Sequence, residues 1–447
     1  MLRSVHYGNP WLQSLLERRF QLRARGSTPG REITAGITSF LTAAYLLVVI
    51  PTLLNGAGMD RSAVTTATIL MFAAATTLMA LYANLPFLVG PGIGGSVLVG
   101  VTLSGAGLPW QTGLGIACLS GVLFLVLTVL GARELVTRII PKQIKLGLSA
   151  SIGIFIALLG FRNAGMVSVD TRTHAFALGD FTRPQVLMAL LGLALAVLLQ
   201  TRRVPGAILW AIVGAAAFGV GLSVTHPPLA PVALPHSLAP VFGQVSFAGA
   251  LSLAAVPYLF VFFASEFFST LGTTLAVGEL AGLLDANGNL PDINRPFLVD
   301  SIAASIGPFF GVPAMTAVIE SSAGAQAGGR TGLTALAAAG CFALTLFLVP
   351  VALAVPQAAT APALILIGLS MLGNIRHISG EFTDLLPVLL MVLLTVMANS
   401  FGTGIAGGLL AHVAVKLLAG RHRELHWGLY VLAVPLGVYF RTVVRPH

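Results

Sequence analysis

The sequence predicts an all-α integral membrane protein with about fourteen transmembrane spans, arranged as seven plus seven in two inverted halves. Three observations support this fold class: an apolar composition, an uneven distribution of basic residues, and two spans interrupted by Gly and Pro. Hydrophobic residues make up 56% of the 447 positions and charged residues only 9%. Such a chain has too little polar surface to cover a soluble globule, so we expect it to lie in a lipid bilayer.

Apolar stretches along the chain approach or reach the roughly 20 residues that span the hydrocarbon of a bilayer. They lie near 33–54, 63–83, 112–131, 146–160, 185–200, 204–224, 250–271, 333–355, 361–373, 384–399 and 402–418. With broken spans at about 87–104 and 308–328, the pattern supports about fourteen crossings. The segment Trp427–Phe440 is too short to count as another span and reads as an interfacial helix.

The basic residues fix the orientation. With the N-terminus inside, only Arg61, Arg162, Arg172 and Arg183 of the 24 Lys and Arg residues fall outside the cytoplasm. This distribution follows the positive-inside rule, so the net charge of +9 reflects topology and argues against nucleic acid as a partner. We expect a multi-pass protein of the inner or plasma membrane with both termini in the cytoplasm.

Each half contains one span broken by Gly and Pro, in the third position (Leu85–Ser96) and in the tenth (Phe309–Gly324). Broken spans in corresponding places indicate a midplane binding site in inverted-repeat transporters. Extended backbone at Phe87–Pro91 and Pro313–Val318 needs protein or a water-filled cavity to satisfy its polar groups. The half-helix that follows each one points free N–H groups at that cavity. Close packing of small residues is the alternative interpretation of the glycines.

Two glutamates, Glu266 and Glu320, lie in apolar sequence that carries almost no other charge. A carboxylate at bilayer depth costs at least ~2.5–3.5 kcal/mol, so it is usually retained to bind an ion, a proton or a substrate. The pair therefore predicts a transporter. Two buried negative charges that face one cavity repel each other, so at least one should bind a proton more readily than a free Glu.

Other polar residues have simpler interpretations. Asp300 follows a cytoplasmic loop and is expected to orient a helix start or to pair with Arg295. His412 is the only histidine well inside a span and is either a packed, hydrogen-bonded residue or a weaker candidate for a proton relay. Cys118 and Cys341 lie in separate spans, and the sequence suggests neither a metal site nor a cofactor.

Several motifs resemble the AzgA-like purine permeases of the nucleobase–cation symporter-2 family, also called nucleobase-ascorbate transporters. They are Arg31–Tyr45, Tyr82–Pro86, Gly90–Gly94, Asp285–Pro291 and Ile319–Thr334. The likeness runs from about residue 30 to 420, and the Ile319–Thr334 block is its most specific part. It implies uptake of purine bases (adenine, guanine or hypoxanthine) with protons by alternating access, through a core domain and a gate domain.

The resemblance also implies the domain boundaries. A cytoplasmic arm (1–30) precedes core segments at 31–135 (spans 1–4) and 250–355 (spans 8–11), gate segments at 140–225 (spans 5–7) and 358–420 (spans 12–14), and a cytoplasmic or interfacial C-terminus at 421–447.

Carried over residue by residue, the family site places Glu266 in span eight, Glu320 in span ten and Gly94 in the span-three turn. Ser96 stands where relatives carry Asn, and Ser269 stands where they carry Asp. These departures leave the class of transporter unchanged and leave open which base it carries.

The chemistry of a purine fits two carboxylates. A purine edge presents ring N–H donors, which carboxylates accept, and acceptors, which half-helix N–H groups serve. We expect Glu266 to be the proton-linked residue and Glu320 the base anchor, with the reverse assignment still open. Further candidates for contact with the base are Phe40, Thr42, Ile319 and Ser321. For Phe40 the alternative interpretation is packing in the hydrophobic core rather than stacking on a base.

Two other classes remain in view. A transporter of the same architecture could carry uracil or xanthine. An inorganic anion is less favoured, because two negatively charged glutamates would repel it. An integral-membrane enzyme is disfavoured because no metal cluster or nucleophile–base arrangement is evident. The sequence is compatible with a homodimer but does not fix the oligomeric state.

Overall fold

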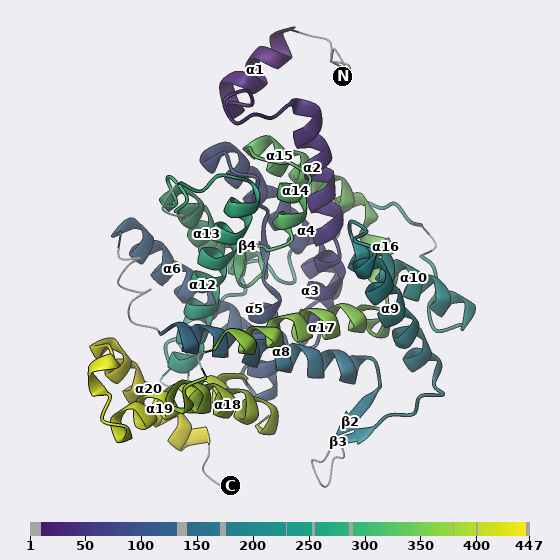
Figure 1. Cartoon of the computed structure of the whole chain (residues 1–447). Coiled ribbons are helices and arrows are strands. Elements are labelled where there is room, and N and C mark those ends of the chain that lie inside the picture. The colour runs from purple at the N-terminus through teal and green to yellow at the C-terminus, as the bar shows by residue number, and fades with distance from the viewer. Residues whose placement is uncertain are drawn as a thin grey trace.

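The computed structural model describes residues 10–131, 141–169, 176–228, 230–252, 255–285, 289–378, 380–398 and 401–443. Arg172 and the expected domain boundary between residues 135 and 140 lie outside the described residues. The described chain is mostly helical, with α1 projecting from one end of the molecule (Figure 1).

The first half contains helices broken at one central strand. Its elements are α1 (Pro10–Phe20), α2 (Pro29–Ala43), α3 (Leu46–Asn55), α4 (Arg61–Leu78), η1 (Met79–Ala83), β1 (Val89–Pro91), α5 (Ile93–Val97), η2 (Leu98–Leu103), α6 (Trp110–Val129), α8 (Lys142–Asn163), β2 (Val167–Val169), β3 (Phe176–Leu178), α9 (Pro184–Thr201) and α10 (Ala207–Gly221). The strands β2 and β3 form a separate short hairpin.

The second half repeats this plan. Its elements are α11 (Phe247–Ala250), α12 (Val256–Leu280), α13 (Asn294–Ile306), η4 (Gly307–Phe310), β4 (Met315–Ala317), α14 (Ser321–Gln326), α15 (Gly332–Thr345), η5 (Leu346–Leu348), α16 (Val349–Ala354), α17 (Gln357–Leu372), η6 (Gly373–His377), α18 (Phe382–Met397), α19 (Phe401–Leu418), η7 (His422–Glu424) and α20 (Trp427–Val443). A strand followed by a short helix thus occurs once in each half.

Eight helical segments in the described part of the chain are long and apolar enough to cross a membrane, and shorter apolar helices accompany them. The all-α membrane fold is confirmed, while the count of fourteen crossings stays a prediction. The eighth expected span, 250–271, was placed too early, because α12 begins at Val256 with a proline in its first turn and continues to Leu280. The position of α20 relative to the bilayer also stays a prediction.

The helices pack in two groups. The first helix group comprises α2, α4, α6, α12, α13, α14 and α15 around the paired strands, and the second comprises α8, α9, α10, α17, α18 and α19. In Figure 1, α8 and α17 of the second group lie side by side. Small residues bring these two helices together, because a methyl group on Gly368 would lie 2.4 Å from the backbone nitrogen of Ala157.

Glu32, at the start of α2, is a fully buried carboxylate that joins α2 to α15. Its oxygens accept hydrogen bonds from the backbone nitrogens of Arg330 (3.1 Å) and Thr331 (3.1 Å) and from the hydroxyls of Thr331 (2.9 Å) and Thr334 (2.6 Å). Donors at the start of a helix have no intrahelical partner, so Glu32 satisfies groups that would otherwise be unpaired. It is a structural residue of the first helix group.

We expect Glu32→Gln to lower the free energy of unfolding by about 1–3 kcal/mol, because the amide nitrogen replaces an acceptor that faces buried donors. Thermal unfolding of the solubilised protein measures this loss. The exposed Glu279→Gln is the matched control and should unfold like the wild type. Equal unfolding temperatures for the two variants would contradict the role of Glu32.

Candidate functional site

The two broken spans meet through their strands, which pair antiparallel with Val89 opposite Ala317 and Pro91 opposite Met315. The pairing continues on both sides, since Gly92 N donates to Ala314 O (2.9 Å) and Val318 N donates to Leu88 O (3.0 Å). The expected extended backbone at Phe87–Pro91 and Pro313–Val318 is therefore confirmed. Each strand supplies the partners that the other lacks at this depth, as a membrane interior requires. Figure 1 places β4 near the centre of the molecule.

The glycines of the first broken span serve two different purposes. A methyl group on Gly90 would lie 2.0 Å from the Phe72 ring, and one on Gly95 would lie 2.1 Å from Cβ of Ala314. Close packing, the alternative interpretation, therefore accounts for these two positions. Gly94 differs, because its added methyl would meet Ile152 at 3.4 Å and Ser265 Oγ at 3.6 Å, which are ordinary contact distances.

Glu266 lies in the middle of α12 with only 1% of its surface exposed. Its Oε2 accepts a hydrogen bond from Ser120 Oγ of α6 at 2.8 Å, whereas Oε1 has no hydrogen-bond partner among the described residues. A small cavity borders this carboxylate and the start of α5. Its lining residues are Gly94, Gly95, Leu98, Val261, Phe262, Ser265, Glu266 and Ala314. The cavity measures about 10 Å³, which is roughly room for one water molecule.

Asp300, fully buried in α13, connects the helix that carries Glu266 to the strand that leads to Glu320. Its Oδ2 accepts hydrogen bonds from Thr270 Oγ1 of α12 and from the backbone nitrogen of Ala317, both at 2.7 Å. The expected pairing with Arg295 is wrong, because Arg295 pairs instead with the exposed Asp292 at 3.6 Å. Asp300 therefore orients β4 and α12 around the site.

Glu320 ends the second broken segment and directly precedes α14. Its Oε1 accepts a hydrogen bond from the hydroxyl of Tyr45 at 2.5 Å, at the break between α2 and α3. Glu320 is half-buried and is not among the residues that line the cavity beside Glu266. The two carboxylates are linked through packing, since α12 contacts both β4 and α14.

The structure turns three predicted site hydroxyls toward the backbone. Ser96 Oγ donates to Gly92 O at 3.0 Å, Thr42 Oγ1 donates to Thr38 O at 2.9 Å, and Ser321 Oγ donates to Val318 O at 2.7 Å. Ser321 Oγ also accepts from Leu88 N at 2.9 Å and so joins the two broken segments. In this structure the three hydroxyls stabilise the site rather than line its cavity.

Two apolar candidates also lie outside that cavity. Ile319 is 52% exposed, and Phe40 packs edge-on against Phe342 with ring centroids 5.0 Å apart. Ser120, Ser265 and Thr270 are neighbours of the site that sequence reasoning missed, because single hydroxyls in apolar helices carry no motif of their own.

His412 belongs to a different polar cluster, in α19 of the second helix group. The buried His412 lies one turn from Lys416, whose Nζ contacts Asp384 Oδ1 at 2.8 Å and Glu424 Oε2 at 2.7 Å. The hydrogen bond from Lys416 lowers the pKa of Glu424 below its ordinary value. The charged groups of this cluster come from α18, α19 and η7, whereas Glu266 lies on α12.

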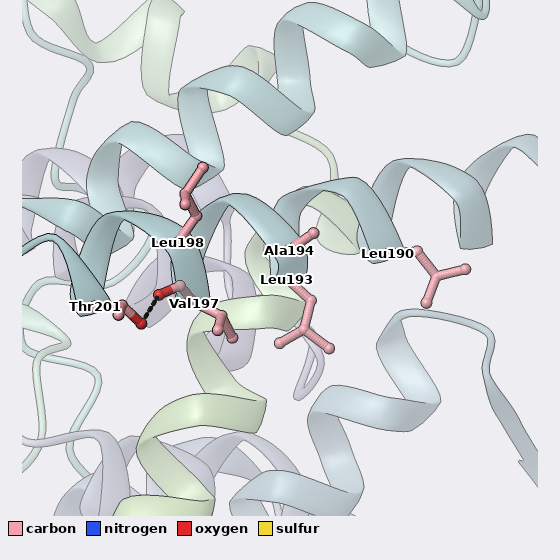
Figure 2. A pocket seen from close by; sticks show the side chains of 6 residues that line it. All are labelled: Leu190, Leu193, Ala194, Val197, Leu198 and Thr201. Atoms are coloured by element: carbon pink, nitrogen blue, oxygen red, sulfur yellow. Dashed lines mark hydrogen bonds between the residues drawn. The ribbon is translucent and has the colours of Figure 1, made fainter.

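A second, shallow hollow lies on α9. Figure 2 shows that its lining side chains all come from this one helix. They are Leu190, Leu193, Ala194, Val197, Leu198 and Thr201. The Thr201 hydroxyl donates within the helix to Val197 O at 2.7 Å, and the other five lining side chains are apolar, so the hollow lacks the several convergent polar groups of a typical ligand site.

Solved structures of membrane transporters share this fold. The transmembrane domain of a cyanobacterium bicarbonate transporter BicA matches with a TM-score of 0.61 at 14% identity, covering 86% of this chain and 97% of that one. The structure of SLC26A9 matches with a TM-score of 0.64 at 13% identity, covering 92% and 67%. This chain thus shares the fold of these two transmembrane proteins, and the exact number of its spans stays a prediction.

A family model described as "Permease family" matches residues 30–406. The chain belongs to this family, the nucleobase–cation symporter-2 permeases that its motifs resemble. It is 35% identical over 415 residues to the adenine permease AdeP of Escherichia coli, covering 92% of this chain and 93% of that protein. It is 36% identical over 429 residues to the guanine/hypoxanthine permease PbuO of Bacillus subtilis, covering 93% and 98%. The protein is a permease and not an enzyme.

We expect Asp300→Asn to reduce transport at least about tenfold, because a neutral amide oxygen accepts the hydrogen bonds from Thr270 and Ala317 more weakly than a carboxylate oxygen does. The amide nitrogen would also take the place of Oδ1, which has no hydrogen-bond partner among the described residues, and would be a buried donor without an acceptor. Initial uptake rates, divided by the amount of protein in the membrane, measure this effect. The exposed Asp292→Asn serves as the control and should transport like the wild type. Full transport by Asp300→Asn would show that β4 keeps its place without this residue.

Proposed function

We propose that the protein is a secondary transporter that imports purine nucleobases together with protons by alternating access. The observation that carries the proposal is the buried Glu266, whose unpaired Oε1 borders a cavity at the start of a half-helix. An intramembrane carboxylate with a free acceptor suits a proton or a ring N–H donor. The names of relatives in Escherichia coli and Bacillus subtilis point to adenine, guanine and hypoxanthine as the bases.

In this proposal the two carboxylates have different tasks. Glu266 is enclosed and, among the described residues, is hydrogen-bonded only to Ser120. It is the proton-linked group, because protonation removes the cost of a charge in a closed cavity. Glu320, half-buried and oriented by Tyr45, is the anchor for the base. N–H groups at the start of α5 serve acceptor atoms on the ligand. The first N–H groups of α14 already donate to the backbone oxygens of Val318, Ile319 and Glu320.

The first helix group corresponds in this proposal to the core domain and the second to the gate domain. The protein resides in the inner or plasma membrane, with both termini in the cytoplasm. Movement of one group against the other exposes the site to alternate sides. An inorganic anion is a weaker alternative, since the fold likeness to BicA and SLC26A9 says nothing of the solute and two carboxylates repel anions.

Uptake of radiolabelled bases into proteoliposomes, with and without an inward proton gradient, tests the function directly. We expect accumulation of adenine, guanine or hypoxanthine that requires the gradient, because protonation of the carrier accompanies each base. Uracil, xanthine and bicarbonate form the comparison arms, and empty liposomes are the control. Accumulation of none of the three purines, or of a purine at the same level without a gradient, would contradict the proposal.

The division of tasks predicts different phenotypes for two amide substitutions. Glu266→Gln should lose accumulation driven by the proton gradient while keeping exchange of base across the membrane, because the amide cannot release a proton. Glu320→Gln should lose binding of the base by at least about tenfold, because an acceptor becomes a donor. Counterflow and equilibrium binding assays separate these effects. Accumulation that still follows the pH gradient in Glu266→Gln would show that another group carries the proton.

A further inference from the structure

Ile152 of α8 is the side chain of the second helix group that approaches the start of α5. Its Cγ2 and Cδ1 lie 3.4 and 3.8 Å from the position that a methyl group on Gly94 would occupy, and the side chain is buried. Ser265 of α12, one residue before Glu266, also lies beside that position, with its Oγ 3.6 Å away. Ile152 thus lies over the same half-helix start that borders the cavity of Glu266.

The close contacts between α8 and α17 hold Ile152 in place. A methyl group on the adjacent Gly153 would lie 2.6 Å from Gly368 O and 2.7 Å from Leu372 N of α17. Farther along α8, a methyl group on Gly160 would lie 2.8 Å from the side chain of Ile365. Because real Cβ atoms do not approach other atoms so closely, α8 and α17 have no room to shift toward each other, and they should move as one unit.

The contact across the two helix groups is different in kind. Between Gly94 and Ile152 there is room for an added methyl group, which would lie at ordinary van der Waals distance from Ile152, and no hydrogen bond joins the two residues among the described contacts. Such a contact can separate without the loss of a buried polar interaction. The boundary between the groups therefore offers a plane of separation at Ile152.

A base can bind beside Glu266 only if the two helix groups separate in this way. The cavity of about 10 Å³ is far below the roughly 300–1,000 Å³ of most small-molecule sites, so a planar base cannot enter while α8 stays in this position. When the helix groups move apart, the withdrawal of Ile152 would enlarge the space over Gly94. When they close on a ligand, the side chain of Ile152 would be the first group of α8 to meet it.

We propose that Ile152 is a specificity-determining residue that closes the base site and limits the size of the ligand. This inference rests on the proposed transport of purine bases and adds a steric limit that is set by the second helix group. A base with a bulky exocyclic substituent is excluded because its substituent occupies the space that Ile152 needs for closure. Shortening Ile152 should admit that substituent.

The test compares Ile152→Val and Ile152→Ala with Ile365→Ala, a matched truncation inside the second helix group. Adenine and guanine compete for uptake against N6-benzyladenine and N2-benzylguanine, respectively. The measured quantity is the inhibitory potency of the benzylated base divided by that of its parent base. We expect this ratio to rise at least about tenfold in Ile152→Ala, because each buried CH₂ equivalent is worth about fourfold in affinity. Ile152→Val should gain less, and Ile365→Ala should keep the wild-type ratio.

The outcomes separate the two proposals. Wild-type protein that transports no purine contradicts the proposed function itself. Wild-type protein that transports a purine, with an unchanged ratio in Ile152→Val and Ile152→Ala, contradicts the steric role of Ile152. An equal gain in Ile365→Ala would also overturn it, since general loosening would then explain the effect. If Ile152→Ala fails to fold, Ile152→Val alone decides, with an expected gain of about threefold or more.

Discussion

The antiparallel pairing of Val89–Pro91 with Met315–Ala317 is the interaction on which the rest of the structure depends. Extended backbone deep in a membrane protein needs hydrogen-bond partners that water cannot supply, and here each broken span supplies them to the other. The pairing places the starts of α5 and α14 at the middle of the molecule. Asp300 then ties the second strand to α12 through Ala317 and Thr270. A carboxylate on α12 and another beside α14 are thereby brought to one region.

Packing by small residues divides the molecule into parts that stay together and parts that can separate. Contacts at Gly90, Gly95, Gly153 and Gly368 are so close that an added methyl group would collide with its neighbours. These positions fix β1 and α5 within the first helix group and α8 against α17 within the second. Gly94 lies at the boundary between the groups, and an added methyl group there would find room at ordinary contact distances. A transporter benefits from this contrast, because rigid units can move against each other without repacking their interiors.

Several features of the fold follow from local sequence. Gly and Pro at Phe87–Pro91 and Pro313–Val318 prevent a continuous helix, so the broken spans could be predicted before the strands were seen. Glu266 and Asp300, both buried, differ in how far the sequence reveals them. Glu266 was conspicuous because its whole neighbourhood is apolar, whereas Asp300 follows a polar loop and resembled a residue at a helix start. Its contact with Ala317 joins segments whose proximity no local pattern reveals.

The sequence by itself determined the membrane class, the two interrupted spans and the two carboxylates, because composition, Gly and Pro act through local chemistry. Only the tertiary structure decided which groups satisfy one another. It turned the hydroxyls of Ser96 and Ser321 toward backbone carbonyls, gave Glu266 the hydroxyl of Ser120 and gave Glu320 that of Tyr45. Each of these side chains has several potential partners. The choice among them is made by how distant helices pack, which is a property of the whole chain and not of any segment.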